Sequence, residues 1–167
     1  AVAISYLVSG NYTIYRSQVP TRRDSPAHKS EYEIPVMQRL KVGQCKRYDI
    51  RVSPSTTVEV ALKLMLDNNF LSLPVVDESS RFIGIVYYRD IEGKNPLDQV
   101  GRYVMRGSPH VSPQSSLEQA WEIMALNRSR WVAVVDKGIF QGMVTMDSLL
   151  ALYEHEVRAL TDTSRDT

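Results

Sequence analysis

The sequence contains little that would support a catalytic, metal-binding or membrane-spanning role. It has one cysteine, Cys45, among 167 residues, which excludes a disulfide framework and fits a reducing compartment. Its three histidines lack the spacing of metal ligands, so we expect no metal site. No stretch approaches the roughly 20 apolar residues needed to cross a bilayer. A Gly-rich phosphate loop, a nucleophile elbow and a Ser-His-Asp grouping are also missing, so we expect no enzymatic activity.

An excess of charge of one sign is missing too. The 20 basic and 19 acidic residues leave a net charge of +1, so no strong field attracts nucleic acid, and we expect no nucleic-acid partner. Hydrophobic residues make up 43% and charged residues 23%, as in ordinary globular proteins. The length suits one domain or two small halves that share a core.

What the chain does contain is a block of about sixty residues that occurs twice. VSPSTTVEVALKLMLDNNFLSLPVVD, at 52–77, recurs 59 residues later as VSPQSSLEQAWEIMALNRSRWVAVVD, at 111–136. One residue is then dropped, and Gly84 and Val86 match Gly142 and Val144. Each of the two copies must bury its apolar face against the other, so we expect the functional site where they meet.

Both copies show the same order of predicted elements, β-α-β-β-α, which indicates an α+β fold. Thr56 with Glu59, and Ser115 with Glu118, predict capping boxes at the start of a helix in each copy. Continuous apolar runs at 73–76 and 132–135 predict buried strands, followed by second strands at 82–88 and 140–145. The last helix is expected from 146 to about 160.

The first 36 residues differ from the repeat. Residues 1–20 carry aromatic residues and few charges, and AVAISYLVSG is typical of the cut end of an apolar helix rather than a signal peptide. Residues 21–36 are polar and flanked by prolines, which indicates a linker. We therefore divide the chain into 1–20, the linker 21–36, repeat halves 37–95 and 96–160, and a tail 161–167.

The repeat resembles the tandem CBS domain pair, or Bateman module. The resemblance rests on LPVVD followed by FIGIVYYRD in copy one, and on VAVVD followed by FQGMVTMDS in copy two. It implies two intertwined halves around a pseudo-twofold, and a homodimer. It also implies two clefts that bind adenine nucleotides in many relatives, so ATP, ADP or AMP is a candidate regulatory ligand, with no cofactor required.

The resemblance assigns roles to the end of each second strand, where the family pattern is close to G-h-h-T/S-x-x-D. In copy one, Asp90 stands at the ribose-binding position and Tyr87 replaces the small hydroxyl residue. The alternative is that Asp90 only caps the following helix. In copy two, Thr145 is in place, but Ser148 occupies the carboxylate position. Asp147 comes one residue early, a turn of about 100° on a helix, so we expect it to point elsewhere. The alternative for Ser148 is again a helix cap.

The family's clefts are built crosswise, so each should combine residues of both copies. The resemblance implies that the cleft at Thr145 also takes residues near Cys45 and Tyr48, Ile50, Phe70 and Leu71. The cleft at Asp90 should take His110, Ser129 and Arg130. Arg128 and Arg130 could contact phosphates, with a solvated basic loop as the alternative for Arg128. Cys45 is expected to be a buried small side chain, and Trp121 and Trp131 core or interface residues.

Residues 1–36 add a second resemblance. GNYTIYRSQVPTRRDSPAH resembles the end of the membrane portion of CLC-family chloride channels and proton/chloride antiporters that carry a cytoplasmic CBS pair. It implies that Tyr15 helps to coordinate the anion in the intact parent. It also implies a regulatory module at the cytoplasmic face of a membrane, attached to the membrane portion of the same polypeptide. The alternative is a stand-alone or enzyme-linked CBS pair that senses adenosyl ligands.

Overall fold

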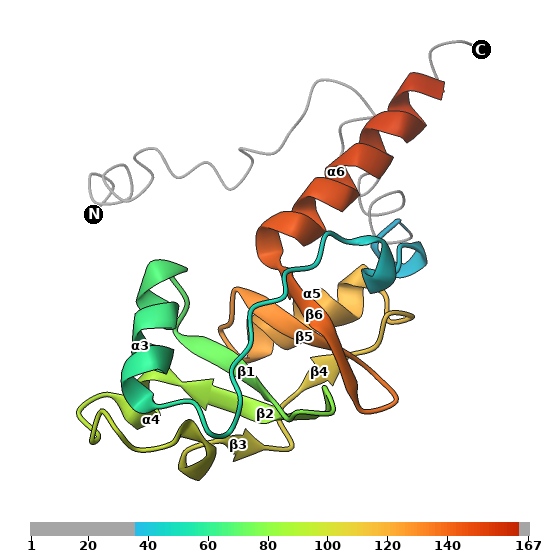
Figure 1. The fold of residues 1–167 in the computed structure, drawn as a ribbon. Helices are drawn as coiled ribbons and strands as arrows, with labels where there is room; N and C mark the ends of the chain where they lie inside the picture. The colour runs from blue at the N-terminus through green and yellow to red at the C-terminus, as the bar shows by residue number, and fades with distance from the viewer. Residues whose placement is uncertain (1–35, 164–167) are drawn as a thin grey trace, which may run out of the picture. The chain divides into compact units, whose positions relative to one another are not determined.

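The computed structural model of the chain describes the backbone of residues 36–163 (Figure 1). The chain divides into two compact units, Ala1–Val36 and Met37–Thr167, and every element named below belongs to the second. The predicted membrane remnant, Tyr15 and nearly all of the predicted linker lie outside the described residues. Within the described part, no helix is long and apolar enough to cross a membrane.

The predicted α+β order is confirmed, with two three-stranded sheets. The first half contains η2 (Val42–Gln44), α3 (Val58–Asp67), β1 (Ser72–Val76), β2 (Phe82–Tyr87) and α4 (Tyr88–Ile91). The second half contains η3 (Val100–Arg102), β3 (Met105–Arg106), β4 (His110–Val111), α5 (Leu117–Leu126), β5 (Trp131–Asp136), β6 (Ile139–Thr145) and α6 (Met146–Thr163). In Figure 1, α3 and α4 lie beside the first sheet, and α6 extends away from the second.

The two halves exchange the segments that begin them. β3, from the second half, pairs with β2 of the first sheet, with Met105 opposite Ile85. In return, Tyr48 from the first half pairs with Met143 of β6, through N–H···O bonds of 2.9 and 2.8 Å. The first sheet therefore takes its third strand from the second half, while the second sheet, whose three strands all come from the second half, gains only isolated bridges from the first half.

A glycine lies at each of these exchanged pairings. Gly84 in β2 has a φ of 158°, and a Cβ there would collide with the carbonyl oxygen of Met105. Gly142 in β6 has a φ of 122°, and a Cβ would lie 3.2 Å from the carbonyl oxygen of Tyr48. Both positions therefore combine an unfavourable backbone conformation with close approach of the swapped segment.

The short 3-10 turns repeat this exchange. The N–H of Gly43, in η2, donates to the carbonyl of Pro113 at 2.8 Å, and the N–H of Gly101, in η3, donates to the carbonyl of Pro54 at 2.9 Å. Each half thus docks its first turn on the Val-Ser-Pro segment of the other. The matching positions of η2 and η3 show that the repeat begins about ten residues before Val52 and Val111, where the matching sequence starts.

The predicted capping boxes are wrong in detail. The helices begin one residue later than expected, and the box in copy two is made by Ser116 and Gln119, whereas the residue before α3 makes no side-chain cap. Thr56 Oγ1 instead accepts the N–H of Ser53 at 3.0 Å, and Ser115 Oγ makes the equivalent bond. The hydroxyls are used to hold the Ser-Pro turns on which the other half docks.

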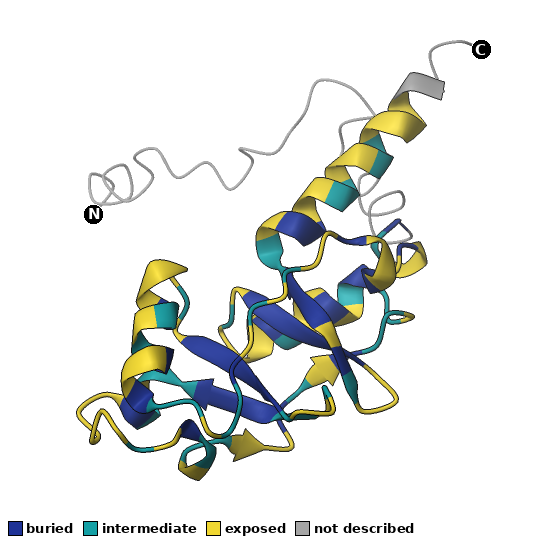
Figure 2. Cartoon of the chain, viewed as in Figure 1, coloured by how far each residue is buried: buried dark blue, intermediate teal, exposed yellow. Residues whose placement is uncertain are grey.

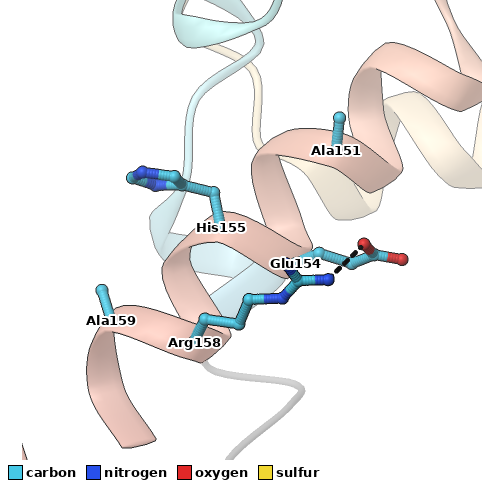
Figure 3. Close-up of a pocket in the computed structure, with 5 residues that line it drawn as sticks. All are labelled: Ala151, Glu154, His155, Arg158 and Ala159. Atoms are coloured by element: carbon cyan, nitrogen blue, oxygen red, sulfur yellow. Dashed lines mark ion pairs between the residues drawn. The ribbon is translucent and has the colours of Figure 1, made fainter. Parts of the chain in front are cut away.

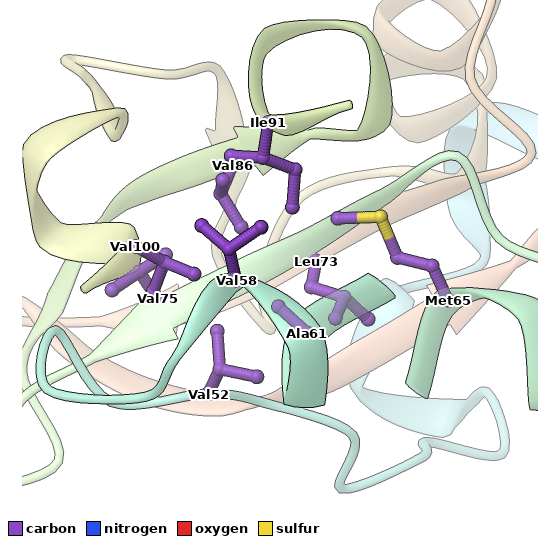
Figure 4. Packing of buried hydrophobic residues seen from close by; sticks show 9 residues of the cluster. All are labelled: Val52, Val58, Ala61, Met65, Leu73, Val75, Val86, Ile91 and Val100. Atoms are coloured by element: carbon purple, nitrogen blue, oxygen red, sulfur yellow. The ribbon is translucent and has the colours of Figure 1, made fainter. Parts of the chain in front are cut away.

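Two groups of buried side chains hold the unit together. One lies between α3, α4 and the first sheet (Figure 4) and consists of Val52, Val58, Ala61, Met65, Leu73, Val75, Val86, Ile91 and Val100. The other joins the two halves and contains Val76, Ile85, Trp131, Ala133, Val135, Phe140 and Met143. Figure 2 shows that the buried residues follow β1, β2, β5 and β6, whereas both residues of β3 are exposed.

Equivalent residues of the two copies contact each other across the interface between the halves. Trp131 Nε1 donates to Ser72 Oγ at 3.1 Å, and these residues lie 59 positions apart. The rings of Phe82 and Phe140 stack with centroids 6.5 Å apart. Contacts between equivalent positions mark the pseudo-twofold axis that the family resemblance implied. The expectation that Trp131 is an interface aromatic is confirmed, while Trp121 is 41% exposed.

Candidate functional site

A cavity of about 530 Å³ opens beside this axis, and we call it the Tyr87 cavity. It is built from the loop after α3, the end of β2 and the loop after α5. Its lining residues are Asn69, Phe70, Leu71, Ser72, Tyr87, Tyr88, Arg89, Asn127, Arg128, Ser129, Arg130 and Trp131. Both copies therefore contribute to it, as the crosswise arrangement predicted.

A smaller cavity of about 290 Å³ adjoins it, and we call it the Thr145 cavity. Its walls come from the segment before α3, the loop after α3 and the junction of β6 with α6. Its lining residues are Tyr48, Ile50, Asn68, Asn69, Phe70, Arg130, Thr145 and Asp147. Four residues expected at the Thr145 cleft are thus brought together: Tyr48, Ile50, Phe70 and Thr145. Asp147 also lines this cavity, although its place one residue early in the pattern predicted that it would point elsewhere. Leu71 lines the Tyr87 cavity instead, with 76% of its surface exposed.

The two cavities occupy equivalent places in the two copies. Tyr87 corresponds to Thr145 in the repeat, and the Asn-containing loops after α3 and α5 correspond to each other. Asn69 and its counterpart Arg128 both end a helix with positive φ values of 55° and 49°. An asparagine is favoured in this conformation, but an arginine is not, so its presence costs backbone energy.

The charge at one corner is reversed between the cavities. Asp147 lines the Thr145 cavity, and its counterpart in the Tyr87 cavity is Arg89. With Arg128 and Arg130, Arg89 gives the Tyr87 cavity three guanidinium groups, and no carboxylate lies among its described lining residues. Guanidinium groups match phosphate oxygens in a bidentate manner, so this arrangement suits a phosphorylated ligand.

Tyr87 presents a neutral hydroxyl to this cavity. Burial raises the pKa of Tyr87 above its ordinary value; Arg89 acts to lower this pKa and Asp90 to raise it. The guanidinium carbon of Arg89 lies 4.9 Å from the centre of the Tyr87 ring, a cation–π contact that holds both side chains at the end of β2.

Asp90 does not line either cavity. It is the third residue of α4, which begins at Tyr88, and Tyr87 occupies the capping position. The alternative interpretation of Asp90 as the helix cap is therefore wrong. Its carboxylate is 38% exposed and lies 3.6 Å from Nε of Arg89. A role for Asp90 in binding ribose stays a prediction.

His110 is also placed away from the cavities. β4 pairs with β5, and the His110 ring lies 5.5 Å from the ring of Phe82, at the first residue of β2. Tyr87 is the last residue of the same strand, so a full strand separates His110 from the Tyr87 cavity. Of the residues expected with Asp90, the structure brings Tyr87, Ser129 and Arg130 together.

Ser148 is buried behind Thr145 rather than exposed in the cavity. Its Oγ accepts the N–H of Thr145 at 3.0 Å, and its N–H donates to Thr145 Oγ1 at 3.2 Å. It is the third residue of α6, so it is not itself the helix cap, and Thr145 holds that place in the reciprocal pair. The position where the family carries a carboxylate thus serves to stabilise the start of α6.

Sequence reasoning missed several lining residues, including Asn68, Asn69, Tyr88, Arg89 and Asn127. Aligning the copies at the end of the second strand would have found Arg89, because it occupies the place of Asp147. The recurrence of Asn68 as Asn127 in the repeat was a signal for the loops that end α3 and α5. Cys45 is buried as expected, and burial raises its pKa to about 11, so it is an unreactive thiol.

Two further hollows lie on outer surfaces. One follows α6 and is lined by Ala151, Glu154, His155, Arg158 and Ala159, with a Glu154–Arg158 ion pair of 3.5 Å (Figure 3). The other lies beside α3, between Leu66, Lys94 and Pro96. The described lining of the first comes from α6 alone, so it lacks the convergent groups from both copies that distinguish the two cavities.

The geometry agrees with a family comparison. The model of the CBS domain family matches residues 42–93 and again 100–155, which together cover more than half of the chain. The chain belongs to the CBS domain family and contains a tandem CBS pair.

Relatives carry this module in different settings. The chain is 27% identical over 133 residues to inosine-5'-monophosphate dehydrogenase of Aquifex aeolicus, covering 77% of this chain and 27% of the enzyme. It is 30% identical over 137 residues to an uncharacterized protein of Methanopyrus kandleri, covering 75% and 69%. The magnesium transporter MgtE of Thermus thermophilus is 31% identical over 112 residues, covering 67% and 24%. The chain thus spans about a quarter of the dehydrogenase and of the transporter.

Solved structures share the fold. A CBS domain pair/ACT domain protein of Thermotoga maritima matches with a TM-score of 0.63 at 22% identity, over 72% of this chain and 99% of that one. CBSX2, solved in complex with AMP, matches with a TM-score of 0.58 at 22% identity over 69% and 97%. The cytosolic domain of the Mg²⁺ channel MgtE, solved with ATP, matches with a TM-score of 0.58 at 23% identity over 77% and 55%.

Proposed function

We propose that this chain is a regulatory module that binds adenine nucleotides in the Tyr87 cavity. The observation that carries the proposal is the set of three arginines, Arg89, Arg128 and Arg130, around one cavity formed by both halves. Its volume of about 530 Å³ lies within the range of roughly 300–1,000 Å³ typical of ligand pockets, while the Thr145 cavity, at about 290 Å³, lies just below it.

The chemistry of the walls suits both parts of a nucleotide. The guanidinium groups offer bidentate hydrogen bonds to phosphate oxygens. Phe70, Tyr87 and Trp131 supply aromatic surface for the base. CBSX2 and the cytosolic domain of MgtE, which share the fold, are known with AMP and with ATP, which supports this choice of ligand.

The role that we propose is regulatory rather than catalytic. Both halves contribute to the cavity, so a change in their relative position would alter the contacts of a ligand bound there. A ligand shifts such an equilibrium only by its difference in affinity for the two arrangements. Nucleotide binding would then be reported to whatever protein or domain is attached to the pair.

Thermal unfolding with and without ATP, ADP and AMP tests the proposal. A ligand at 100 times its dissociation constant raises the free energy of unfolding by about 2.7 kcal/mol. We expect Arg128→Gln to reduce the shift, and Arg158→Gln, on the outer face of α6, to leave it unchanged. The absence of any shift at millimolar nucleotide would contradict nucleotide binding and leave a structural module.

We also propose that the pair forms a homodimer, as CBS pairs commonly do. The outer surfaces of α3 and α5 carry exposed apolar side chains that a second copy could cover. They are Val60 (54% exposed), Leu66 (69%), Trp121 (41%) and Leu126 (84%). Analytical ultracentrifugation with and without nucleotide measures the assembly, and a monomer at all concentrations contradicts it.

Two kinds of parent protein are candidates for this module. An enzyme-linked or stand-alone pair is favoured by relatives such as the dehydrogenase and the uncharacterized archaeal protein. The narrower assignment, to the cytoplasmic region of a CLC-family channel or antiporter, rests on residues 1–36, and none of the relatives named above supports it. The coding sequence upstream of Ala1 tests the narrower assignment, because it requires many apolar membrane segments there.

A further inference from the structure

Arg130 lies between the two cavities. Three described residues, Asn69, Phe70 and Arg130, line both the Tyr87 cavity and the Thr145 cavity, and of these only Arg130 carries a charge. Its backbone is fixed because its carbonyl accepts the N–H of Met146 at 2.8 Å, which ties the start of β5 to the start of α6. Its side chain is 70% exposed, so the guanidinium group can reorient while the backbone stays in place.

The present partner of Arg130 belongs to the Thr145 cavity. Nη2 of Arg130 lies 3.8 Å from Oδ2 of Asp147, whose side chain is 81% exposed. An exposed ion pair of this length is weak, contributing roughly 0.2–1 kcal/mol. Arg130 lines the Tyr87 cavity with Arg89 and Arg128 while it is paired with Asp147, so a phosphate group in that cavity and the Asp147 carboxylate would contact the same guanidinium group.

We propose that Arg130 is a specificity-determining switch residue that Asp147 and a phosphate group compete to bind. A phosphate in the Tyr87 cavity withdraws Arg130 from Asp147, and the Asp147 carboxylate in the Thr145 cavity is then left without this partner. The occupancy of one cavity therefore changes the charge of the other. This inference rests on the proposed function for the nucleotide, but it requires only that the Tyr87 cavity accept a phosphorylated anion.

Competition between Asp147 and phosphate for Arg130 predicts that removing a carboxylate from the Thr145 cavity strengthens phosphate binding in the Tyr87 cavity. Asp147→Asn removes the competitor and should strengthen phosphate binding by about two- to fivefold, the range that a weak exposed ion pair allows. Removing any carboxylate also makes the protein more positive, so a matched control is needed. Glu154→Gln provides it, because Glu154 forms a similar exposed pair with Arg158, at 3.5 Å, and does not line either cavity.

A double-mutant cycle isolates the role of Arg130. We would measure the affinity of the full chain for ATP and for tripolyphosphate by calorimetry. The variants are Asp147→Asn, Arg130→Gln, the two combined, and Glu154→Gln. Arg130→Gln should weaken binding, and in that background Asp147→Asn should no longer strengthen it. Glu154→Gln should stay within experimental error of the wild type in physiological salt, because screening is strong beyond about 8 Å.

The outcomes separate this inference from the proposed function. If ATP binds but Asp147→Asn matches Glu154→Gln, or still strengthens binding without Arg130, the switch is overturned and nucleotide binding stands. If tripolyphosphate binds with the expected cycle and nucleotides do not bind, the switch stands and the nucleotide proposal fails. If neither ligand binds, both are overturned.

Discussion

The two halves of this protein use equivalent residues where they dock on each other and different residues where they form cavities. Gly43 and Gly101 donate to Pro113 and Pro54, and Ser72 meets Trp131 across the axis. At the ends of the second strands, however, Tyr87 replaces Thr145 and Arg89 replaces Asp147. A duplicated scaffold can therefore keep its fold while its two cavities acquire different volumes and different charges, three arginines in one and one arginine with one aspartate in the other.

The docking positions and the cavity positions are under different structural constraints. Docking positions use backbone groups and glycines, where any side chain would collide, so both copies must agree. Cavity positions use side chains that point into open space, where a change of charge or size does not disturb packing. The unequal cavities agree with the proposal that one of them, the Tyr87 cavity, binds the ligand.

The first and largest test of the comparison concerns the paired glycines in the sheets. Gly84→Ala should reduce the free energy of unfolding by about 3 kcal/mol or more, because its Cβ would collide with backbone at Met105 in addition to the strain of its φ. Gly142→Ala should reduce the free energy of unfolding by about 1–2 kcal/mol, since its Cβ would lie 3.2 Å from the carbonyl oxygen of Tyr48. Urea unfolding measures both.

Gly107→Ala is the control for backbone strain alone. Gly107 has a φ of 70°, and an added methyl group would have no neighbouring atom within 4 Å, so the change should cost about 1 kcal/mol. Equal costs at Gly84 and Gly107 would show that the swapped strand β3 can move away without penalty, and that the exchange of segments contributes little to stability.

The second test breaks the contact on the pseudo-twofold axis. Ser72→Ala leaves the buried Trp131 indole N–H without its acceptor and should cost about 1–3 kcal/mol. In a Trp131→Phe background, which has no N–H to satisfy, the same change should cost much less. Chemical denaturation of the four proteins gives the coupling energy, and a coupling near zero would mean that the hydrogen bond does not join the halves.

A third test makes one cavity resemble the other. Arg89→Asp places in the Tyr87 cavity the residue type that the Thr145 cavity carries at the equivalent position, and it should weaken nucleotide binding about tenfold or more, since a charge-assisted bond becomes a repulsion. Arg81→Asp, at the exposed turn before β2, makes the same charge change away from both cavities and is the control. Equal losses in both variants would show that only net charge matters.

The comparison also explains what could be predicted from the sequence. The order of elements followed from the repeat, because apolar runs and helical spacing are local signals repeated at a fixed distance. The pseudo-twofold was implied by the family resemblance. The roles of Thr56 and Ser115 were missed because their hydroxyls bond back to the Ser-Pro turns that receive the opposite half. These hydroxyl bonds are themselves local, but the docking that they serve joins segments far apart in the chain, and no local pattern records it.

The cavities were predicted in part for a related reason. Tyr48 and Phe70 were placed correctly beside Thr145, because the family resemblance carries the crossed arrangement of the two halves. Arg89 was missed because a charged residue at a strand end has no periodic signal of its own. His110 was expected near Asp90, but its pairing with Ala133 places it beside Phe82, at the opposite end of β2.

The comparison with the smallest expected effect at neutral pH concerns the residues that follow the two 3-10 turns, Cys45 and Tyr103. Burial raises the pKa of Cys45 from 9.0 to about 11, and a hydrogen bond to Asp98 raises the pKa of Tyr103. As pH rises above 9, the unfolded thiol loses its proton while the folded thiol keeps it. The free energy of unfolding should therefore fall between about pH 9 and 11, by up to 1.4 kcal/mol per unit of pKa difference, and Cys45 should have no such effect below pH 9.

Cys45→Ala should make this decline shallower, whatever its effect on stability at neutral pH. Tyr103→Phe is the matched variant in the other half, and it should remove only a contribution that begins near the ordinary pKa of tyrosine, about 10. Denaturation at a series of pH values from 7 to 11 measures the slopes. An unchanged slope in Cys45→Ala would show that water reaches the Cys45 thiol in the folded protein. The environments of Cys45 and Tyr103 would then differ more than the matching backbone bonds of the two 3-10 turns indicate.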